Sequence, residues 1–314
     1  MPTVDVAGQK MKSQEQLDSS QAEARVGKIL ALFRQLGELN AQIDFEHSFK
    51  TVQDHLFADR FLLGLNRQEL GASQDERIAS ICENICMPYK LLASFRRTLP
   101  DANQVYFGVE RNERTLLYKA YLEFRDKIEK EIGRRPVKGH SFRLFTGFKW
   151  DAFSPERQAI TRYDWYPSLP IAELYERLQI TLEPSRHGGL LEVVQGITER
   201  ASREMSHDDI QYLEVSEEGN PRRSFDINIY KSGLRVEDLC PYILRASRHY
   251  AIPFGSFDSL YQRIKAERFG HLAGGIDREN KDFMTVYYGV KTIHSSQFGS
   301  ATIVREDRPP QESR

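Results

Sequence analysis

The feature that most constrains the fold of this chain is a repeated pairing of β-rich runs, in which each pair is followed by an amphipathic helix. Four such pairs follow one another from residue 103, and short polar turns separate the two runs of each pair. Two runs joined by a tight turn must pair antiparallel, so a parallel sheet of the Rossmann or TIM type is disfavoured. The pairs are residues 104–110 with 116–124, 142–150 with 160–166, 210–215 with 225–230, and 270–276 with 283–290.

Alternation of residue types within the runs assigns one face of the strands to helices. Phe225, Ile227 and Ile229 share one face, and the positions between them are polar. Four or five hairpins that each deliver a helix to the same side are accommodated most simply by a sheet that closes on itself, which also removes exposed edges. We therefore predict an α+β fold, a closed antiparallel β-barrel of about ten strands surrounded by helices.

The segment before these pairs is predicted to be helical. Apolar residues recur at helical spacing over residues 26–36 and again over residues 49–57. Ser73 followed by Glu76 has the pattern of a capping box, which predicts that a third helix begins there and continues until Pro88 interrupts it.

The chain of 314 residues could hold one large domain or two ordinary ones, and the repeated unit favours one. Residues 1–20 and 297–314 are polar, with too little apolar material to offset the entropy of ordering. We therefore expect a single barrel domain over residues 21–296, with a flexible segment on either side.

Composition excludes several classes of protein. The net charge of −1 provides no general attraction for nucleic acid or for an anionic membrane, and no apolar run approaches the roughly 20 residues that span a bilayer. Cys82, Cys86 and Cys240 are too few and too unevenly placed for a disulfide framework, and no further ligands complete a metal site around the first two. We expect a cytoplasmic monomer without nucleic-acid or membrane partners.

The chain lacks the named catalytic signatures. It contains no phosphate-binding loop, dinucleotide fingerprint, zincin motif or serine elbow, and its eight histidines are scattered. The pair Asp208-Asp209 stands alone, so no aspartate-rich cluster could hold a magnesium diphosphate. A bound diphosphate would therefore have to be held by cationic side chains.

The polar faces of the predicted strands would combine cations, tyrosines and carboxylates inside the barrel. A ring of basic side chains there would bind a compact polyanion such as a diphosphate, because charge-assisted bonds are strong where water is scarce. Tyrosine rings around it would shield a carbocation through cation–π attraction. The alternative is that these rows face solvent on an open sheet. Alternate positions place on the inner rows Tyr106, Glu110, Lys119, Tyr121, Glu123, Lys149, Arg162, Asp164, Tyr166, Asp226, Asn228, Tyr230, Thr285 and Tyr287.

In this pattern the chain resembles the aromatic prenyltransferases with the αββα barrel, and most of all the cyanobactin peptide prenyltransferases among them. The resemblance covers roughly residues 45–292 and is carried by the stretches 116–124, 146–150, 162–166, 224–230 and 286–291. It implies transfer of a dimethylallyl or geranyl group from its diphosphate, aided by Mg²⁺, to a nucleophilic side chain. The acceptor would be a small linear or cyclic peptide of ribosomal origin.

The resemblance also implies roles for individual residues. Lys119 and Arg162 match the family's diphosphate-binding cations, and Lys149 and Asn228 are added to them as further diphosphate-binding residues. Tyr166, Tyr230 and Tyr287 match the tyrosines that shield the carbocation in the family, and Tyr121 is added to them.

Catalysis is assigned to carboxylates. Gln104 stands where related enzymes place a catalytic glutamate on the first barrel strand, which leaves Glu110, Asp164 and Asp226 as the candidates. An acidic lumen would suit a cationic acceptor such as an arginine guanidinium, whose nitrogen needs a neighbouring carboxylate to take its proton.

Three other functions stay open at this point. The same fold could act on an indole or phenol metabolite, or the barrel could carry a small ligand without catalysis. A scaffold whose polar strands face water would enclose no cavity at all.

Overall fold

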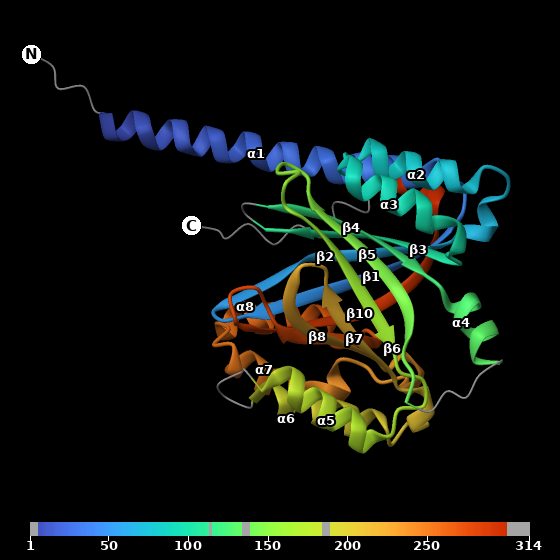
Figure 1. Ribbon diagram of the computed structural model, residues 1–314. Helices are drawn as coiled ribbons and strands as arrows, with labels where there is room; N and C mark the ends of the chain where they lie inside the picture. The colour runs from blue at the N-terminus through green and yellow to red at the C-terminus, as the bar shows by residue number, and fades with distance from the viewer. Residues whose placement is uncertain (1–5, 113–114, 134–138, 184–188, 300–314) are drawn as a thin grey trace, which may run out of the picture.

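The ten strands of this computed structural model close into one antiparallel barrel, in the order β1-β10-β9-β8-β7-β6-β5-β4-β3-β2 (Figure 1). The structure describes residues 6–112, 115–133, 139–183 and 189–299. Closure confirms the predicted fold class and excludes the open sheet, because each strand is hydrogen-bonded on both sides. The strands are β1 (Gln42–Val52), β2 (His55–Asn66), β3 (Gln104–Arg111), β4 (Leu116–Glu123), β5 (Phe142–Asp151), β6 (Gln158–Trp165), β7 (Gln211–Glu217), β8 (Asn220–Asn228), β9 (Phe269–Ile276) and β10 (Asp282–His294).

Consecutive strands form hairpins, and helices lie outside the barrel. Figure 1 shows α1, α2 and α3 gathered on one side of the barrel and α5 and α6 on the opposite side. In the described part of the chain no helix is long and apolar enough to cross a membrane. The helices are α1 (Val6–Gly37), α2 (Gln74–Asn84), α3 (Tyr89–Thr98), α4 (Arg125–Ile132), α5 (Ile171–Leu182), α6 (Gly189–Ala201), α7 (Cys240–His249) and α8 (Phe254–Ile264), with short 3₁₀ turns η1 (Arg67–Leu70), η2 (Leu99–Asp101), η3 (His207–Asp209), η4 (Tyr230–Ser232), η5 (Glu237–Leu239) and η6 (Ser295–Gly299).

Two large apolar clusters hold the helices against the outer face of the barrel. The first joins α1, α2 and α3 to strands β1–β5, and in it the ring of Phe95 meets that of Phe148 edge-on at 5.4 Å. The second joins α5–α8 to strands β7–β10 and contains Phe225, Ile227 and Ile229, all fully buried. The predicted helix-facing side of β8 is therefore confirmed, and each of these side chains stabilises the fold by about 1.5–3 kcal/mol on burial.

The segment 49–57 belongs to a β-hairpin, so the helix predicted there is wrong. A turn at Gln53 and Asp54 joins β1 to β2, and Asp54 has φ 61°. The helix-like spacing of Phe49, Val52 and Leu56 combines residues from two strands across this turn. Periodicity alone cannot separate such a hairpin from a helix when the turn falls inside the window.

The helix predicted after Ser73 is confirmed as α2, but its capping box does not form. Ser73 is in the left-handed conformation, with φ 63° and ψ 19°, and its side chain makes no capping hydrogen bond. Glu76 instead accepts a hydrogen bond from Arg96 of α3 at 2.9 Å. Glu76 thus bonds to the neighbouring helix α3 instead of capping the N-terminus of α2.

Helix α1 begins at Val6, inside the N-terminal segment for which we expected flexibility. Residues 297–299 belong to η6, and residues 300–314 lie outside the described residues. The division of the chain at residues 20 and 296 stays a prediction.

Candidate active site in the barrel lumen

The lumen of the barrel contains two adjoining cavities, of about 100 Å³ and about 310 Å³. We call the smaller the basic cavity and the larger the acidic cavity. Four residues line both and so form the boundary between them: Tyr121, Tyr163, Asp226 and Tyr287.

The basic cavity is built around Glu110 of β3. Arg60 of β2 lies opposite Glu110 in the strand register, and its Nη1 is 2.7 Å from Glu110 Oε1. Lys119 of β4 approaches from the other side, with Nζ 2.9 Å from Oε2. Lys149 of β5 pairs with Lys119 in the register, and Lys50 of β1 lines the same cavity. The first five strands, β1 to β5, thus bring four cations around one carboxylate.

Two further carboxylates line the basic cavity, but both are committed to other cations. Asp226 is bound to His271, and Glu217 accepts a hydrogen bond from Arg278 Nε at 3.0 Å. The positive charge of the cavity therefore exceeds the negative charge that faces it, which suits an anionic ligand.

Burial and charge act in opposite directions on the groups of this cavity. Burial by itself would raise the pKa of Glu110, but Arg60, Lys119 and Lys149 hold it well below its usual range. Burial, only partly opposed by Glu110, lowers the pKa of Lys119 to about 7. A second anion would restore the proton to Lys119, because an added negative charge favours the ammonium form.

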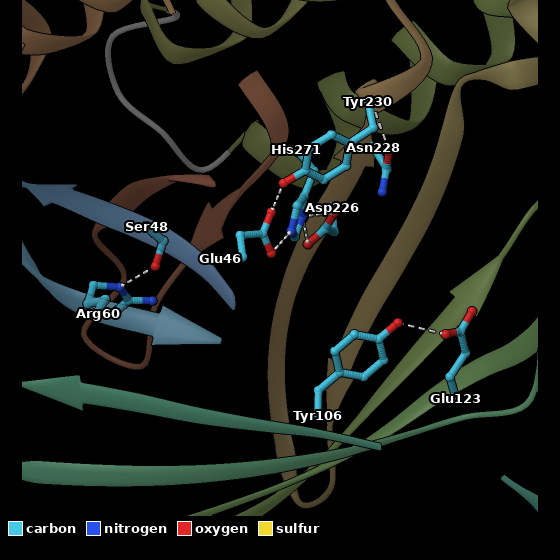
Figure 2. A network of polar contacts seen from close by, with 9 residues as sticks. All are labelled: Glu46, Ser48, Arg60, Tyr106, Glu123, Asp226, Asn228, Tyr230 and His271. Carbon is cyan, nitrogen blue, oxygen red and sulfur yellow. Dashed lines mark hydrogen bonds and ion pairs between the residues drawn. The ribbon is translucent and has the colours of Figure 1, made fainter. Parts of the chain in front are cut away.

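The acidic cavity is built around Glu46 of β1 (Figure 2). The Tyr230 hydroxyl donates a hydrogen bond to Glu46 Oε1, and His271 Nε2 lies 3.4 Å from Oε2. His271 Nδ1 contacts both oxygens of Asp226, at 2.9 and 3.0 Å. Asp44 lines the same cavity and is exposed to solvent. Carboxylates thus dominate the larger cavity.

A second polar chain lies on the other wall of the acidic cavity. The Tyr106 hydroxyl donates to Glu123 Oε2 at 2.9 Å, and Arg125 Nε donates to Glu123 Oε1 at 2.9 Å (Figure 2 shows the first of these bonds). Arg125 Nη2 also donates to the side-chain oxygen of Gln211 at 3.4 Å. Burial, with Glu123 second, raises the pKa of Tyr106 well above its usual range, so its hydroxyl stays a donor.

The boundary between the cavities is aromatic. The rings of Tyr121 and Tyr163 meet edge-on at 5.8 Å, and the ring of Tyr287 stacks on His271 at 3.8 Å. Gly147 leaves room for Tyr121, because a Cβ at this position would lie 2.9 Å from its ring. Three tyrosine side chains thus lie where the two cavities adjoin.

Most of the predicted site residues line the lumen, although their roles stay predictions. Those that line one or both cavities are Glu110, Lys119, Tyr121, Lys149, Asp226, Asn228, Tyr230 and Tyr287. Asn228 also accepts a hydrogen bond from the Tyr230 backbone N–H at 3.1 Å through its side-chain oxygen.

The predicted inward orientation of the residues at 162, 164 and 166 is wrong. Arg162 is 48% exposed on the outer face of β6, where it pairs with Glu218. Asp164 pairs with Arg143 Nε at 2.6 Å and lines a surface cavity beside α5. Tyr166 packs in the outer apolar cluster that contains α5, beneath the guanidinium of an α5 arginine.

The error on β6 has a physical cause. Over residues 160–166 both faces mix polar and aromatic residues, so alternation alone does not tell them apart. Pairing with β5 decides: Gly147 lies opposite Thr161, and Lys149 lies opposite Ala159. Tyr163, not Arg162, therefore faces the lumen.

Several lumen residues were not predicted, and most lie on the β1–β2 hairpin, of which residues 49–57 had been assigned to a helix. They include Asp44, Glu46, Lys50, Arg60, Tyr163 and His271. A signal for β1 was present, because apolar and polar residues alternate over residues 43–46 and 48–50 as they do in a half-buried strand. The first strand of the barrel is thus β1, which carries Glu46. Gln104 lies on the third strand, β3, so its predicted place on the first barrel strand is wrong.

The lumen does not fit a metal ion held by the protein. Among the described residues no group of three or more His, Cys, Asp and Glu side chains is placed to hold one. Both oxygens of Glu110 are in ion pairs with Arg60 and Lys119.

Comparison with known proteins reveals a likeness of structure, not of sequence. No protein-family model matches the sequence, and no curated protein matches it. Among solved structures, the prenyltransferase PriB in a ternary complex with L-tryptophan and dimethylallyl thiolodiphosphate matches with a TM-score of 0.53 at 10% identity, over 81% of this chain and 80% of that one.

Two further prenyl-transfer proteins match similarly. The NotF prenyltransferase has a TM-score of 0.51 at 12% identity, over 78% of this chain and 80% of that one. The 5-dimethylallyltryptophan synthase from Streptomyces coelicolor has a TM-score of 0.51 at 11% identity, over 82% of each chain. Identities this low show the fold alone: the chain has the antiparallel ten-stranded αββα barrel of these prenyltransferases.

Proposed function

We propose that this protein is a prenyltransferase that moves a dimethylallyl or geranyl group from its diphosphate to a side chain of a small ribosomal peptide, with arginine as the acceptor. The observation that carries the proposal is the division of the lumen into a cation-lined and a carboxylate-lined cavity, with tyrosines between them. The fold shared with PriB and NotF supports the reaction class.

The donor diphosphate binds in the basic cavity. Lys50, Arg60, Lys119 and Lys149 supply charge-assisted bonds to its oxygens, while Glu110 holds two of these cations in place. The bond between the allylic carbon and the diphosphate oxygen breaks, and its electron pair leaves with the diphosphate. The allyl cation then lies against the boundary tyrosines, whose ring faces stabilise it.

The acceptor side chain enters the acidic cavity, where its positive charge is attracted by Asp44 and Glu46. Glu46 takes a proton from the guanidinium while the nitrogen lone pair that this frees attacks the allylic carbon and forms the new C–N bond. We assign the proton to Glu46 because its carboxylate lines the cavity that the acceptor enters. Glu110, which lies between two cations, is a poorer base than we first predicted.

Glu46→Gln is expected to lower kcat by about 10²–10⁴-fold, because the amide cannot take the proton. KM for the diphosphate should change little, since Glu46 lies in the other cavity. Steady-state turnover of labelled dimethylallyl diphosphate measures both constants. Glu218→Gln, which removes an outer-face carboxylate, is the matched control. An unchanged kcat in Glu46→Gln would assign the proton to another group.

Mass spectrometry of a peptide panel tests the proposed function. Peptides that differ at one position (arginine, lysine, citrulline or tryptophan) are incubated with dimethylallyl or geranyl diphosphate. We expect a mass gain of one prenyl group on the arginine peptide and none on the uncharged citrulline peptide. A gain on tryptophan alone would favour an indole acceptor, a candidate that the L-tryptophan bound in the PriB complex supports. Diphosphate binding without any product would indicate a ligand carrier.

Chelation of Mg²⁺ with EDTA is expected to lower kcat/KM by less than about tenfold. The four cations of the basic cavity already neutralise much of the diphosphate charge, so Mg²⁺ would act as a counterion that arrives with the donor. Complete loss of turnover in EDTA, restored by added Mg²⁺, would contradict this expectation.

That the protein acts as a cytoplasmic monomer, without nucleic-acid or membrane partners, stays a prediction.

A further inference from the structure

The imidazole of His271 lies at the centre of a buried charged cluster at the boundary of the two cavities (Figure 2). Its Nδ1 contacts Asp226 at 2.9 and 3.0 Å, and its Nε2 lies 3.4 Å from Glu46. The side chain of His271 is 14% exposed, and those of Glu46 and Asp226 are 9% and 10% exposed. Three strands, β1, β8 and β9, thus bring one histidine between two buried carboxylates.

Two buried carboxylates near one another cannot both stay charged without a cation between them. The charged and titratable groups around this cluster come from every element that packs against it. They are Asp44 of β1, Arg60 of β2, Tyr163 of β6, Tyr230 of η4, Tyr287 of β10, and Arg268 beside β9. Arg60 is committed to Glu110, and Arg268 donates to the Tyr230 carbonyl. His271 is therefore the cation in direct contact with both carboxylates.

The same ring also orients a boundary tyrosine. The ring planes of His271 and Tyr287 are 9° from parallel, with their centroids 3.8 Å apart. A charged imidazole attracts the face of the phenol ring, and the stack fixes the plane that Tyr287 presents to the basic cavity. One side chain thus contacts both the carboxylates and the aromatic boundary.

We propose that His271 is a positioning residue that acts as a permanent cation: it keeps Glu46 and Asp226 ionised together and holds the Tyr287 ring in place. It is not the base of the reaction, because both of its nitrogens face carboxylates as donors. Burial opposes the charge, but Asp226 and Glu46 outweigh it and raise the pKa of His271 to about 10. Where the inference concerns turnover, it rests on the proposed function.

NMR titration of isotopically labelled Asp and Glu carboxyl carbons tests the inference without any turnover. In His271→Gln, one of the two cluster carboxyls should take up a proton at a pH about one unit or more above wild type, because the cation between them is gone. His249→Gln is the matched control, since the His249 side chain is also only 10% exposed and contacts Asp282 at 2.6 Å but lies outside both cavities. It should leave the cluster titration unchanged. Identical curves for His271→Gln and wild type would overturn the proposal.

The pH dependence of turnover gives a second readout. The acidic limb of kcat/KM should move to higher pH in His271→Gln, and His271→Lys should move it back because the charge returns. A purely structural role would lower activity at every pH without moving the limb. If His271→Gln fails to fold, the wild-type ring decides: an imidazole that loses its proton between pH 6 and 7, near the usual value of about 6.5, contradicts the inference. A carboxyl shift without any prenyl product would refute the proposed function and leave this inference intact.

Discussion

Lys119→Met is expected to lower kcat/KM for the allylic diphosphate by about 100-fold, because it removes a charge-assisted bond among largely buried side chains. Burial, partly opposed by Glu110, lowers the pKa of Lys119 to about 7 in the free protein. Lys119 is charged below this pH and neutral above it, so wild-type kcat/KM should fall as the pH rises through about 7. The variant should lack this fall. Steady-state kinetics across the pH range measures both effects.

Arg162→Met is the matched control for this experiment. Both cations were predicted to bind the diphosphate, but only Lys119 lines the lumen. Arg162 pairs with Glu218 on the outer face, so its replacement should leave kcat/KM and its pH profile unchanged. Equal losses of kcat/KM in the two variants, or a loss in Arg162→Met alone, would contradict donor binding in the lumen. Such a result would indicate that the donor contacts the outer face of β6. Thermal unfolding of both variants separates binding from folding.

Ile227→Asp is expected to destabilise the barrel by about 4 kcal/mol or more, which is enough to unfold it. Ile227 is fully buried between β8 and the outer helices, where a carboxylate would find no cation in the apolar cluster around it. Denaturant unfolding followed by circular dichroism measures the free energy.

Asn228→Ala tests the opposite face of the same strand. Its side chain points to the lumen and accepts one hydrogen bond, from the Tyr230 N–H, so the change should cost only about 1 kcal/mol. A folded, active Ile227→Asp protein would mean that the two faces of β8 are reversed.

How far the fold could be predicted depended on the contrast between the two faces of each strand. On β8, Phe225 and Ile227 alternate with polar residues, and the structure places them as alternation requires. On β6 the outer face contains no fully buried side chain, so a polar residue such as Arg162 is tolerated there. The pairing of β6 with β5 then determines which side chains of β6 face the lumen. This pairing cannot be deduced from a single sequence.

The candidate site could be predicted only in part, because it depends on contacts between remote segments. Glu46 and His271 lie on β1 and β9, which meet only because β10 lies between them in the closed barrel. The ion pairs of Glu110 with Arg60 and Lys119 likewise join three strands. Alternation identified the inward side chains on β3, β4, β5, β8 and β10, but not those on β6, and it did not show that cations and carboxylates separate into two cavities.

The most direct test of this separation is a crystal structure with dimethylallyl thiolodiphosphate, the donor analogue bound in the PriB complex. We expect its diphosphate to lie among Arg60, Lys119 and Lys149, with the prenyl group directed at the boundary tyrosines and the acidic cavity open beyond them. A diphosphate bound beside Glu46, or on the outer face near Arg162, would contradict the account.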